Sequence, residues 1–204
     1  MSAYRVFGMS TSGNCHKVRL VLDNLRIAYE WVEVDTTKGE SRSRTFLEMN
    51  PNGRVPTLQV EPHVYLPESD AILYYLAEGT PLWPAGRLPR AQVLQWMFFE
   101  QYSHEPYIAV GRWILAFLPP DSPRRAELPK LHERGYQALE VMEKHLDARE
   151  FFVGERYSIA DIALFAYTNP AAEGGFDLSR YKAINAWLAR VKAQPGYQEM
   201  PSPT

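Results

Sequence analysis

Two stretches of the chain read Asn50-Pro51-Asn52-Gly53-Arg54-Val55-Pro56-Thr57-Leu58 and Glu68-Ser69-Asp70-Ala71-Ile72. A Val-Pro bond between a glycine-containing turn and an apolar strand is a position where a cis proline is retained, which turns the backbone N–H and C=O of Val55 outward. Those two groups can pair with an extended peptide in the way that a sheet edge does. The first stretch therefore predicts a platform for a short peptide.

Glu68 and Ser69 come twelve and thirteen residues after Pro56 and precede the apolar positions that begin at Ala71, so we expect them in the first turn of a helix. Unpaired backbone N–H groups and the positive end of the helix dipole favour a carboxylate at that point. Together with the Val-Pro platform, this pair predicts a site for a short, acidic peptide that carries a thiol.

The N-terminal part of the chain alternates short strands with helices. Apolar spacing predicts the order β-α-β-α-β-β-α, with strands at residues 4–7, 31–34, 57–60 and 64–66 and with helices near residues 18–25 and 71–77. Three prolines and two glycines between residues 79 and 89 then predict a boundary. We expect an α/β domain over residues 1–79, a linker over 80–90 and an all-helical domain over 91–204.

The second part of the chain has helical periodicity. A long helix is expected over residues 93–117, with Pro106 and Gly111 kinking or interrupting it, and further apolar stripes cover residues 128–146 and 184–191. Ser158 followed by Asp161 is a variant of the capping box, to which we assign a structural role. On that basis Asp161→Ala is expected to cost roughly 0.5–2 kcal/mol.

The Val-Pro platform, the Glu-Ser pair and the Ser158-Ile159-Ala160-Asp161 box together resemble the cytosolic glutathione S-transferase family, in particular its bacterial, theta- and beta-like members. The resemblance covers nearly the whole chain. It implies a thioredoxin-like N-terminal domain followed by a helical-bundle C-terminal domain. It also implies glutathione as co-substrate, a small electrophilic substrate, a role in detoxification, and a homodimer.

Composition excludes several other classes of protein. The chain has 204 residues, 46% of them hydrophobic, and a net charge of −2, so it has neither the composition of a disordered chain nor the basic surface that nucleic acid requires. The lack of a leader-like N-terminus and of a long apolar stretch predicts a cytoplasmic protein without a membrane segment. Cys15 is the single cysteine, and the five histidines show no ligand-like pairing, so we expect no metal site.

The reactive group is expected in the segment Ser10–Lys17, between the first strand and the first helix, because the start of a helix stabilises an anion such as a thiolate. Three residues there resemble the thiol-activating residues of different family branches, namely Ser12, Asn14 and Cys15. We favour Ser12, with Ser10 and Thr11 as further alternatives. The alternative for Ser12 is an ordinary N-cap, and the alternative for Cys15 is a small apolar residue of the core.

Two other functions remain open at this point. The segment Ser12-x-x-Cys15 is similar to a Cys-x-x-Cys site that has lost its first cysteine, which removes an internal dithiol cycle. A glutathione-dependent disulfide reductase is still compatible with it, because a second glutathione can replace the missing cysteine. The third interpretation is a non-catalytic protein that binds glutathione or another ligand, or serves in assembly.

Further contacts follow from the resemblance. Lys38 and Arg54 are candidates for the glycine carboxylate of glutathione, although each is equally typical of a solvated surface cation. Glu68 is expected to pair with the α-amino group of the γ-glutamyl residue, and Ser69 with its α-carboxylate. Val55 and Pro56 would hold the cysteinyl backbone.

The electrophile should meet the aromatic side chains of the long helix. Tyr107 and Trp113 are our candidates for that pocket, while aromatic residues at helical spacing are more often part of a core.

Overall fold

The computed structural model describes residues 4–203, which form two compact units. Residues 4–80 and 195–202 make up the first unit, and residues 81–194 with Pro203 make up the second. The first is a thioredoxin-like α/β unit and the second is all-helical, as the sequence predicted. No helix among residues 4–203 is both long and apolar enough to cross a lipid bilayer.

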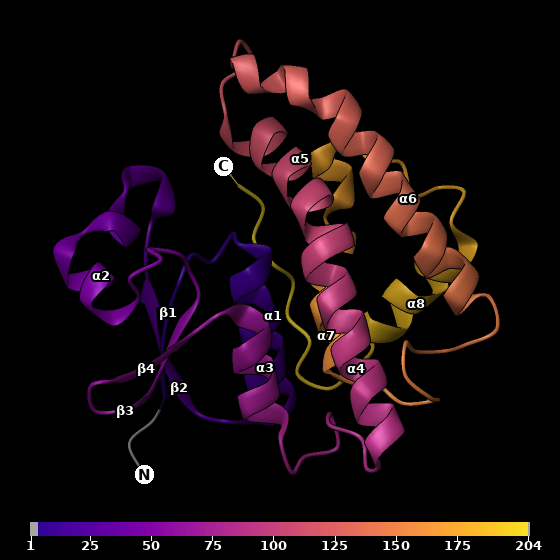
Figure 1. Ribbon diagram of the computed structural model, residues 1–204, viewed down its shortest axis with the longest axis horizontal. Coiled ribbons are helices and arrows are strands. Elements are labelled where there is room, and N and C mark those ends of the chain that lie inside the picture. The colour runs from indigo at the N-terminus through magenta and orange to yellow at the C-terminus, as the bar shows by residue number, and fades with distance from the viewer. Residues whose placement is uncertain (1–3, 204) are drawn as a thin grey trace. The chain divides into compact units, whose positions relative to one another are not determined.

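The first unit has the predicted order of elements (Figure 1). Its strands and α-helices are β1 Tyr4–Gly8, α1 Gly13–Asn24, β2 Tyr29–Glu33, α2 Arg44–Met49, β3 Thr57–Glu61, β4 Val64–Pro67 and α3 Ser69–Ala77. Two short 3-10 helices, Thr36–Lys38 and Glu40–Arg42, connect β2 to α2. The sheet has the order β2-β1-β3-β4, in which β1 and β2 are parallel and β3 runs antiparallel to both of its neighbours.

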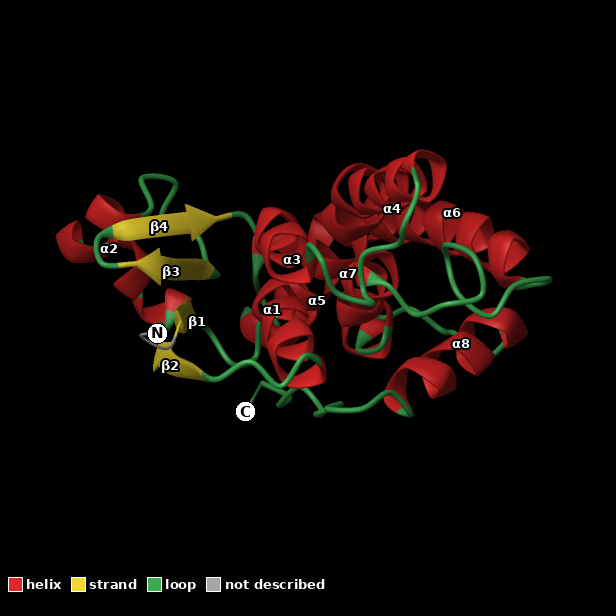
Figure 2. Cartoon of the chain, turned by 90° about the horizontal axis from the view of Figure 1, so that it is seen from below, coloured by secondary structure: helices red, strands yellow, loops and turns green. Residues whose placement is uncertain are grey.

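Both faces of this sheet are covered by helices. α1 and α3 lie on one face and α2 lies on the other (Figure 2). Phe7 of β1 packs in one cluster with Phe46 of α2 and Val34. Because successive side chains of a strand point to opposite faces, Val6 is directed to the other face, and it too is fully buried. Residues 195–202 pass beside α1, where the Asn24 side-chain amide donates to the Pro195 carbonyl.

The second unit contains five α-helices among its described residues. They are α4 Arg87–Phe99, α5 Glu105–Phe117, α6 Leu128–Leu146, α7 Ile159–Thr168 and α8 Lys182–Lys192. Two short 3-10 helices, Pro123–Glu127 and Ala171–Gly174, join them. Every residue of α7 is buried, which identifies it as the central helix of this unit.

The long helix predicted over residues 93–117 is in fact two helices, separated by a π-helical turn at Glu100–His104. Pro106 lies in the first turn of α5, where a missing N–H costs nothing. Gly111 does not interrupt α5, contrary to expectation. A Cβ at this position would lie 3.3 Å from the Gly174 carbonyl oxygen, so Gly111 allows a close approach of backbones. Pro89 likewise sits in the first turn of α4 and does not prevent that helix from starting at Arg87.

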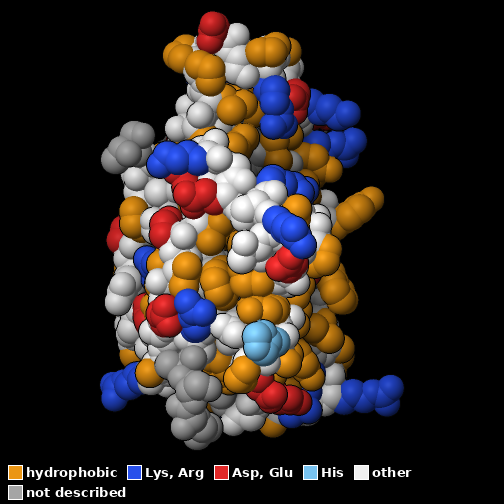
Figure 3. Space-filling model, turned by 90° about the vertical axis from the view of Figure 1, so that its left-hand side faces the viewer, with side chains coloured by type: hydrophobic (Ala, Val, Ile, Leu, Met, Phe, Trp, Pro, Cys, Tyr) orange, Lys and Arg blue, Asp and Glu red, His pale blue; other side chains and the backbone are white. Residues whose placement is uncertain are grey.

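The face shown in Figure 3 carries charges of both signs. Lys and Arg side chains are interspersed there with Asp, Glu and hydrophobic side chains. This distribution agrees with the small net charge of −2. Such a face does not produce the single-sign field that attracts a polyanion.

Asp161 is the centre of a hydrogen-bond network at the start of α7. The capping box with Ser158 is present, and Asp161 Oδ2 accepts from the Ser158 N–H at 2.9 Å. Asp161 Oδ1 also accepts from the Phe152 N–H and from the Trp187 indole N–H, each at 3.0 Å. Burial raises the pKa of this carboxyl to about 6, against the effect of the donors around it. Asp161 therefore joins α7, α8 and the loop before α7.

We expect Asp161→Ala to lower the free energy of unfolding by about 3 kcal/mol or more, above the range predicted from a cap alone. The substitution leaves two buried N–H donors, of Phe152 and Trp187, without their acceptor, at about 1–3 kcal/mol each. Ser158→Ala is the matched control and should cost only about 1 kcal/mol. Urea unfolding of both variants measures the difference, and equal losses would contradict the role given to Asp161.

Candidate functional site

Strand pairing brings three of the predicted segments to one edge of the sheet. Phe7 of β1 pairs with Thr57 of β3, and Thr57 pairs with Pro67 of β4. The turn after β1, the Val55-Pro56 bond before β3 and the start of α3 after β4 consequently follow one another along that edge. The structure therefore brings the segments that carry Ser12, Val55 and Ser69, which are distant in the sequence, to the same edge of the sheet.

Ser12 is the N-cap residue of α1, with φ −87° and ψ 127°, but its hydroxyl makes no capping hydrogen bond. The hydroxyl instead reaches the sulfur of Cys15. Ser12 is only partly buried. Its hydroxyl is therefore not committed to the cap that was the alternative explanation for a serine at this position.

Glu33, at the end of β2, holds the turn that precedes Ser12. Its Oε1 accepts from the Ser10 N–H at 2.8 Å and from the Ser10 hydroxyl at 3.2 Å. Its Oε2 accepts from the Trp31 indole N–H at 2.7 Å. Sequence analysis did not identify Glu33. The available signal was an acidic residue at the end of the strand that pairs in parallel with β1.

Cys15 is fully buried, and the Met9 N–H donates to its sulfur at 3.4 Å. Burial raises the pKa of the Cys15 thiol to about 12, although the Ser12 hydroxyl and the Met9 N–H oppose that shift. At neutral pH the side chain is therefore a protonated thiol. These surroundings favour the core interpretation of Cys15 over that of a thiol-activating residue.

Asn14 reaches the beginning of α3. The Ser69 hydroxyl donates to Asn14 Oδ1 at 3.3 Å, and Ser69 is itself buried. This contact directs Asn14 toward the residue expected to hold the α-carboxylate. Lys17, which sequence analysis also did not identify, contacts the same serine.

The Val55-Pro56 peptide bond is cis, as predicted. No residue in the described range 4–203 hydrogen-bonds to the N–H or the C=O of Val55. The buried side chain of Asn50 fixes the loop, because its amide donates to the Arg54 carbonyl at 2.8 Å and to the Thr57 hydroxyl at 3.2 Å. The two polar groups of the Val55 backbone are thus held in place and available to a ligand.

The two predicted cations differ in their surroundings. Lys38, at the end of the 3-10 helix Thr36–Lys38, pairs with the N-cap residue Asp35, Nζ to Oδ2 at 3.0 Å. Hydrogen bonds from Thr37 and Lys38 lower the pKa of Asp35 to about 2. Arg54 is exposed beside the Val55-Pro56 bond, and only its carbonyl takes part in the loop.

Glu68 adopts a backbone conformation that is rare for any residue except glycine. It has φ 67° and ψ 113° and caps α3 without using its side chain. Strain of this kind costs of order 1–3 kcal/mol and is concentrated at functional sites. Its carboxylate is exposed, one residue before the buried Ser69.

Tyr107 and Trp113 both belong to α5 and both are partly buried. They are six residues apart, so their side chains leave the helix about 120° from one another. The Trp113 ring stacks on Phe117, with centroids 4.6 Å apart. Tyr107 and Trp113 therefore cannot both lie at the middle of the same face of α5.

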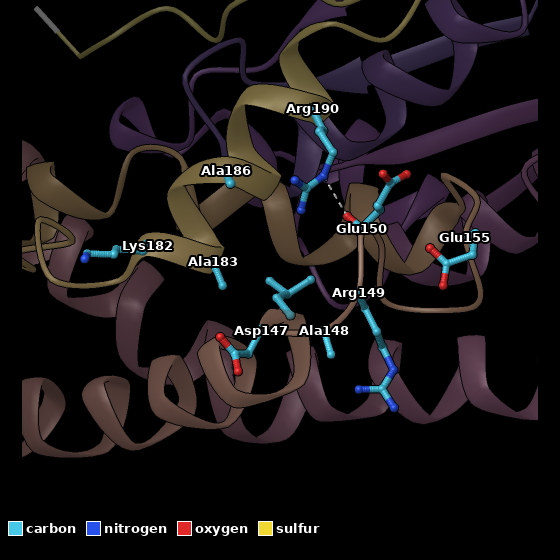
Figure 4. A pocket seen from close by; sticks show the side chains of 10 residues that line it. Asp147, Ala148, Arg149, Glu150, Glu155, Lys182, Ala183, Ala186 and Arg190 are labelled. Atoms are coloured by element: carbon cyan, nitrogen blue, oxygen red, sulfur yellow. Dashed lines mark hydrogen bonds between the residues drawn. The ribbon is translucent and has the colours of Figure 1, made fainter.

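Two hollows among the described residues of the second unit are lined by none of the candidate residues. One, of about 580 Å³, lies between the segment 81–92 and the loop 153–158. The other, of about 420 Å³, is bordered by acidic and basic side chains from the segment that follows α6 and by basic side chains from α8 (Figure 4). There the Arg190 side chain donates to the Glu150 carbonyl at 3.0 Å. Within residues 4–203, no cluster of His, Cys, Asp and Glu is arranged to hold a metal ion.

Comparison with known families covers both units. The family description "Glutathione S-transferase, N-terminal domain" matches residues 6–83, and "Glutathione S-transferase, C-terminal domain" matches residues 107–195. The disulfide-bond oxidoreductase YfcG of Escherichia coli (strain K12) is 31% identical, over 89% of this chain and 87% of that protein. Glutathione S-transferase 3 of Zea mays is 29% identical, over 98% of this chain and 93% of that protein.

Solved structures agree with these matches. A glutathione S-transferase from Pseudomonas fluorescens superposes with a TM-score of 0.93 and is 53% identical, covering 98% of this chain and 99% of that one. A glutathione transferase from Pseudomonas putida, with one glutathione disulfide bound per subunit, has a TM-score of 0.83 and 26% identity, over 95% of this chain and 88% of that one.

We expect Cys15 in the folded protein to resist thiol reagents up to mildly alkaline pH, because the thiol is buried and its pKa lies near 12. Since Cys15 is the single cysteine, the rate of alkylation of the protein measures the reactivity of this residue alone. The same protein unfolded in urea provides the control and should react at the rate of a free cysteine. Equal rates in the two states would contradict the buried, protonated thiol.

We expect Glu68→Gly to be more stable than Glu68→Ala by about 1 kcal/mol, because glycine tolerates a positive φ and alanine keeps the strain. Both substitutions remove the same carboxylate, so the pair isolates the backbone contribution. Urea unfolding at equal protein concentration measures it. A more stable alanine variant would show that Glu68 is not strained.

Proposed function

This chain belongs to the glutathione S-transferase family, and we propose that it is a glutathione transferase that activates the thiol of glutathione for attack on small electrophiles. One observation carries the proposal. The strand register brings the segments that carry Ser12, Val55 and Ser69 to one edge of the sheet, where the Val55 backbone is unpaired and Ser69 is buried. That order matches the thiol, the cysteinyl backbone and the γ-glutamyl end of glutathione.

In this proposal each segment has one task. The Val55 N–H and C=O pair with the cysteinyl residue, and Ser69 at the start of α3 receives the α-carboxylate of the γ-glutamyl residue. Glu68 takes the α-amino group. Arg54 is exposed beside the platform and suits the glycine carboxylate better than Lys38, which already pairs with Asp35.

Ser12 supplies the chemistry when its hydroxyl turns from the Cys15 sulfur and donates a hydrogen bond to the glutathione sulfur. A thiol with a pKa of about 8.5 is about 3% ionised at neutral pH, whereas one with a pKa of about 6.5 is about 75% ionised. That shift corresponds to about 2.7 kcal/mol, which one or two hydrogen bonds to a charged sulfur can provide. The thiol proton passes to solvent, the sulfur bonds to the electrophilic carbon, and the leaving group departs with its bonding electrons.

The electrophile and the assembly are part of the proposal. Trp113, stacked on Phe117, offers aromatic surface for an apolar substrate on one side of α5, and Tyr107 is the alternative on another side. A homodimer is supported by the exposed aromatic side chains of Phe98 and Tyr102, which are 69% and 83% exposed and four residues apart on consecutive helical turns.

A glutathione-dependent disulfide reductase is the second candidate. It is favoured by the similarity to a disulfide-bond oxidoreductase and to a transferase solved with glutathione disulfide. In that reaction two glutathione molecules are oxidised to glutathione disulfide while the substrate disulfide takes up two electrons and two protons. The protonated, buried Cys15 gives no protein thiol to this cycle, so both thiols must come from glutathione.

A protein that binds glutathione without chemistry is the third candidate. The Ser12 hydroxyl, which is not used for capping, argues against it. Activity with model electrophiles and with a hydroxyethyl disulfide distinguishes the three functions, since the third predicts neither reaction.

We expect Ser12→Ala to raise the pKa of bound glutathione by about 1–2 units and to lower turnover about tenfold or more, with a smaller change in glutathione affinity. The ultraviolet band of the thiolate, followed against pH in the complex, measures the pKa. Ser10→Ala is the matched control, because it removes a neighbouring hydroxyl that is bound to Glu33.

An unchanged thiol pKa in Ser12→Ala would remove Ser12 from this role. The same titration of Cys15→Ala and Asn14→Ala would then show which of the two other candidates carries it.

A further inference from the structure

Lys17 is a charged side chain with no exposed surface. It lies on α1, and its side chain is 0% exposed. Lysine is almost never fully buried unless its ammonium is paired, because transfer of a charge out of water is costly. Burial of Lys17 therefore indicates a specific task for its ammonium.

The ammonium contacts two consecutive residues at the start of α3. Lys17 Nζ lies 3.2 Å from Asp70 Oδ1 and 3.4 Å from the Ser69 hydroxyl oxygen. That hydroxyl in turn donates to Asn14 Oδ1 at 3.3 Å. Two side chains of α1 thus hold the Ser69 hydroxyl: Lys17 donates to its oxygen, and Asn14 accepts its proton.

This arrangement improves Ser69 as a hydrogen-bond donor. A hydroxyl oxygen that accepts from an ammonium is polarised, and its own proton becomes a stronger donor. When a carboxylate arrives, the Ser69 hydroxyl can turn its proton from Asn14 to the ligand while Lys17 continues to hold the oxygen. Lys17 Nζ would then lie within about 6 Å of the carboxylate, because a hydrogen bond adds about 2.7 Å to the 3.4 Å already observed.

The negative charge of Asp70 is the reason that a carboxylate bound at Ser69 needs the positive charge of Lys17. The Asp70 carboxylate follows Ser69 in the first turn of α3 and is only 15% exposed. Without a cation beside it, this carboxylate would repel another carboxylate bound at Ser69. At such distances one unit charge changes affinity by about tenfold or more.

We propose that Lys17 is a positioning residue for the γ-glutamyl end of glutathione: its buried ammonium holds the Ser69 hydroxyl and offsets the charge of Asp70, so that the α-carboxylate can bind. This inference rests on the proposed function. It assigns to α1 a part in recognising the end of the ligand that is remote from the thiol.

The test compares two ligands that differ only in that carboxylate. Glutathione and its analogue γ-aminobutyryl-cysteinylglycine, which lacks the α-carboxylate, are titrated calorimetrically into the full chain. The ratio of their dissociation constants measures the contribution of the carboxylate. A purely structural effect of a substitution changes both constants alike and leaves the ratio unaltered.

We expect Lys17→Met to reduce the preference for glutathione about tenfold, because Asp70 then repels the carboxylate. Asp70→Asn should maintain or increase the preference, and the double variant Lys17→Met/Asp70→Asn should recover most of it. An ion pair that serves only to join α1 to α3 predicts no change of the ratio in any variant, and that outcome overturns the inference.

Folding is checked by thermal unfolding of each variant. If Lys17→Met alone does not fold, the double variant and Asp70→Asn test the proposal instead. A lower preference for glutathione in Asp70→Asn would contradict it. Failure of the proposed function gives a different result: wild-type protein then binds neither ligand at millimolar concentration. If the wild-type protein binds glutathione but substitution of Lys17 leaves the ratio of the two dissociation constants unchanged, only this inference is refuted.

Discussion

The pairing of Phe7 with Thr57, and of Thr57 with Pro67, is the constraint on which the candidate site depends. Each of these residues lies at or next to the end of its strand, so the segments that leave the strands there become neighbours. A slip by one residue would turn the buried Thr57 to the opposite face and would separate the Val55 backbone from the start of α3. The buried faces of β1, covered by helices on both sides, keep that register fixed.

At that edge, the start of α1 offers two very different environments, one for the sulfur of Cys15 and one for the sulfur of a bound ligand. Cys15 is enclosed, and burial keeps its thiol protonated. Ser12, three residues earlier, is partly exposed at the start of α1, where the helix dipole and a hydroxyl donor favour an anion. In our proposal the reactive sulfur is therefore brought by the ligand, and the protein contributes the site that ionises it.

The sequence predicted the general plan of the molecule well and its side-chain directions poorly. The order of strands and helices, the cis Val55-Pro56 bond and the capping box all follow from local chemistry that a short window contains. Ser12, Asn14 and Cys15 could not be separated, because they share one helical turn and differ only in the direction each side chain takes. Lys17 and Glu33 were missed since their partners, Asp70 and Ser10, come from other elements of the fold.

The central claim is that one ligand, glutathione, binds along this sheet edge from Ser12 to Ser69. The most direct measurement is a titration of isotope-labelled protein with glutathione, followed by the backbone amide signals in two-dimensional nuclear magnetic resonance spectra. Our account predicts that the largest shifts arise at Val55, at Ser69 and in the turn that leads to Ser12, and that they saturate together. Shifts confined to other parts of the chain, or no saturable shifts, would contradict it.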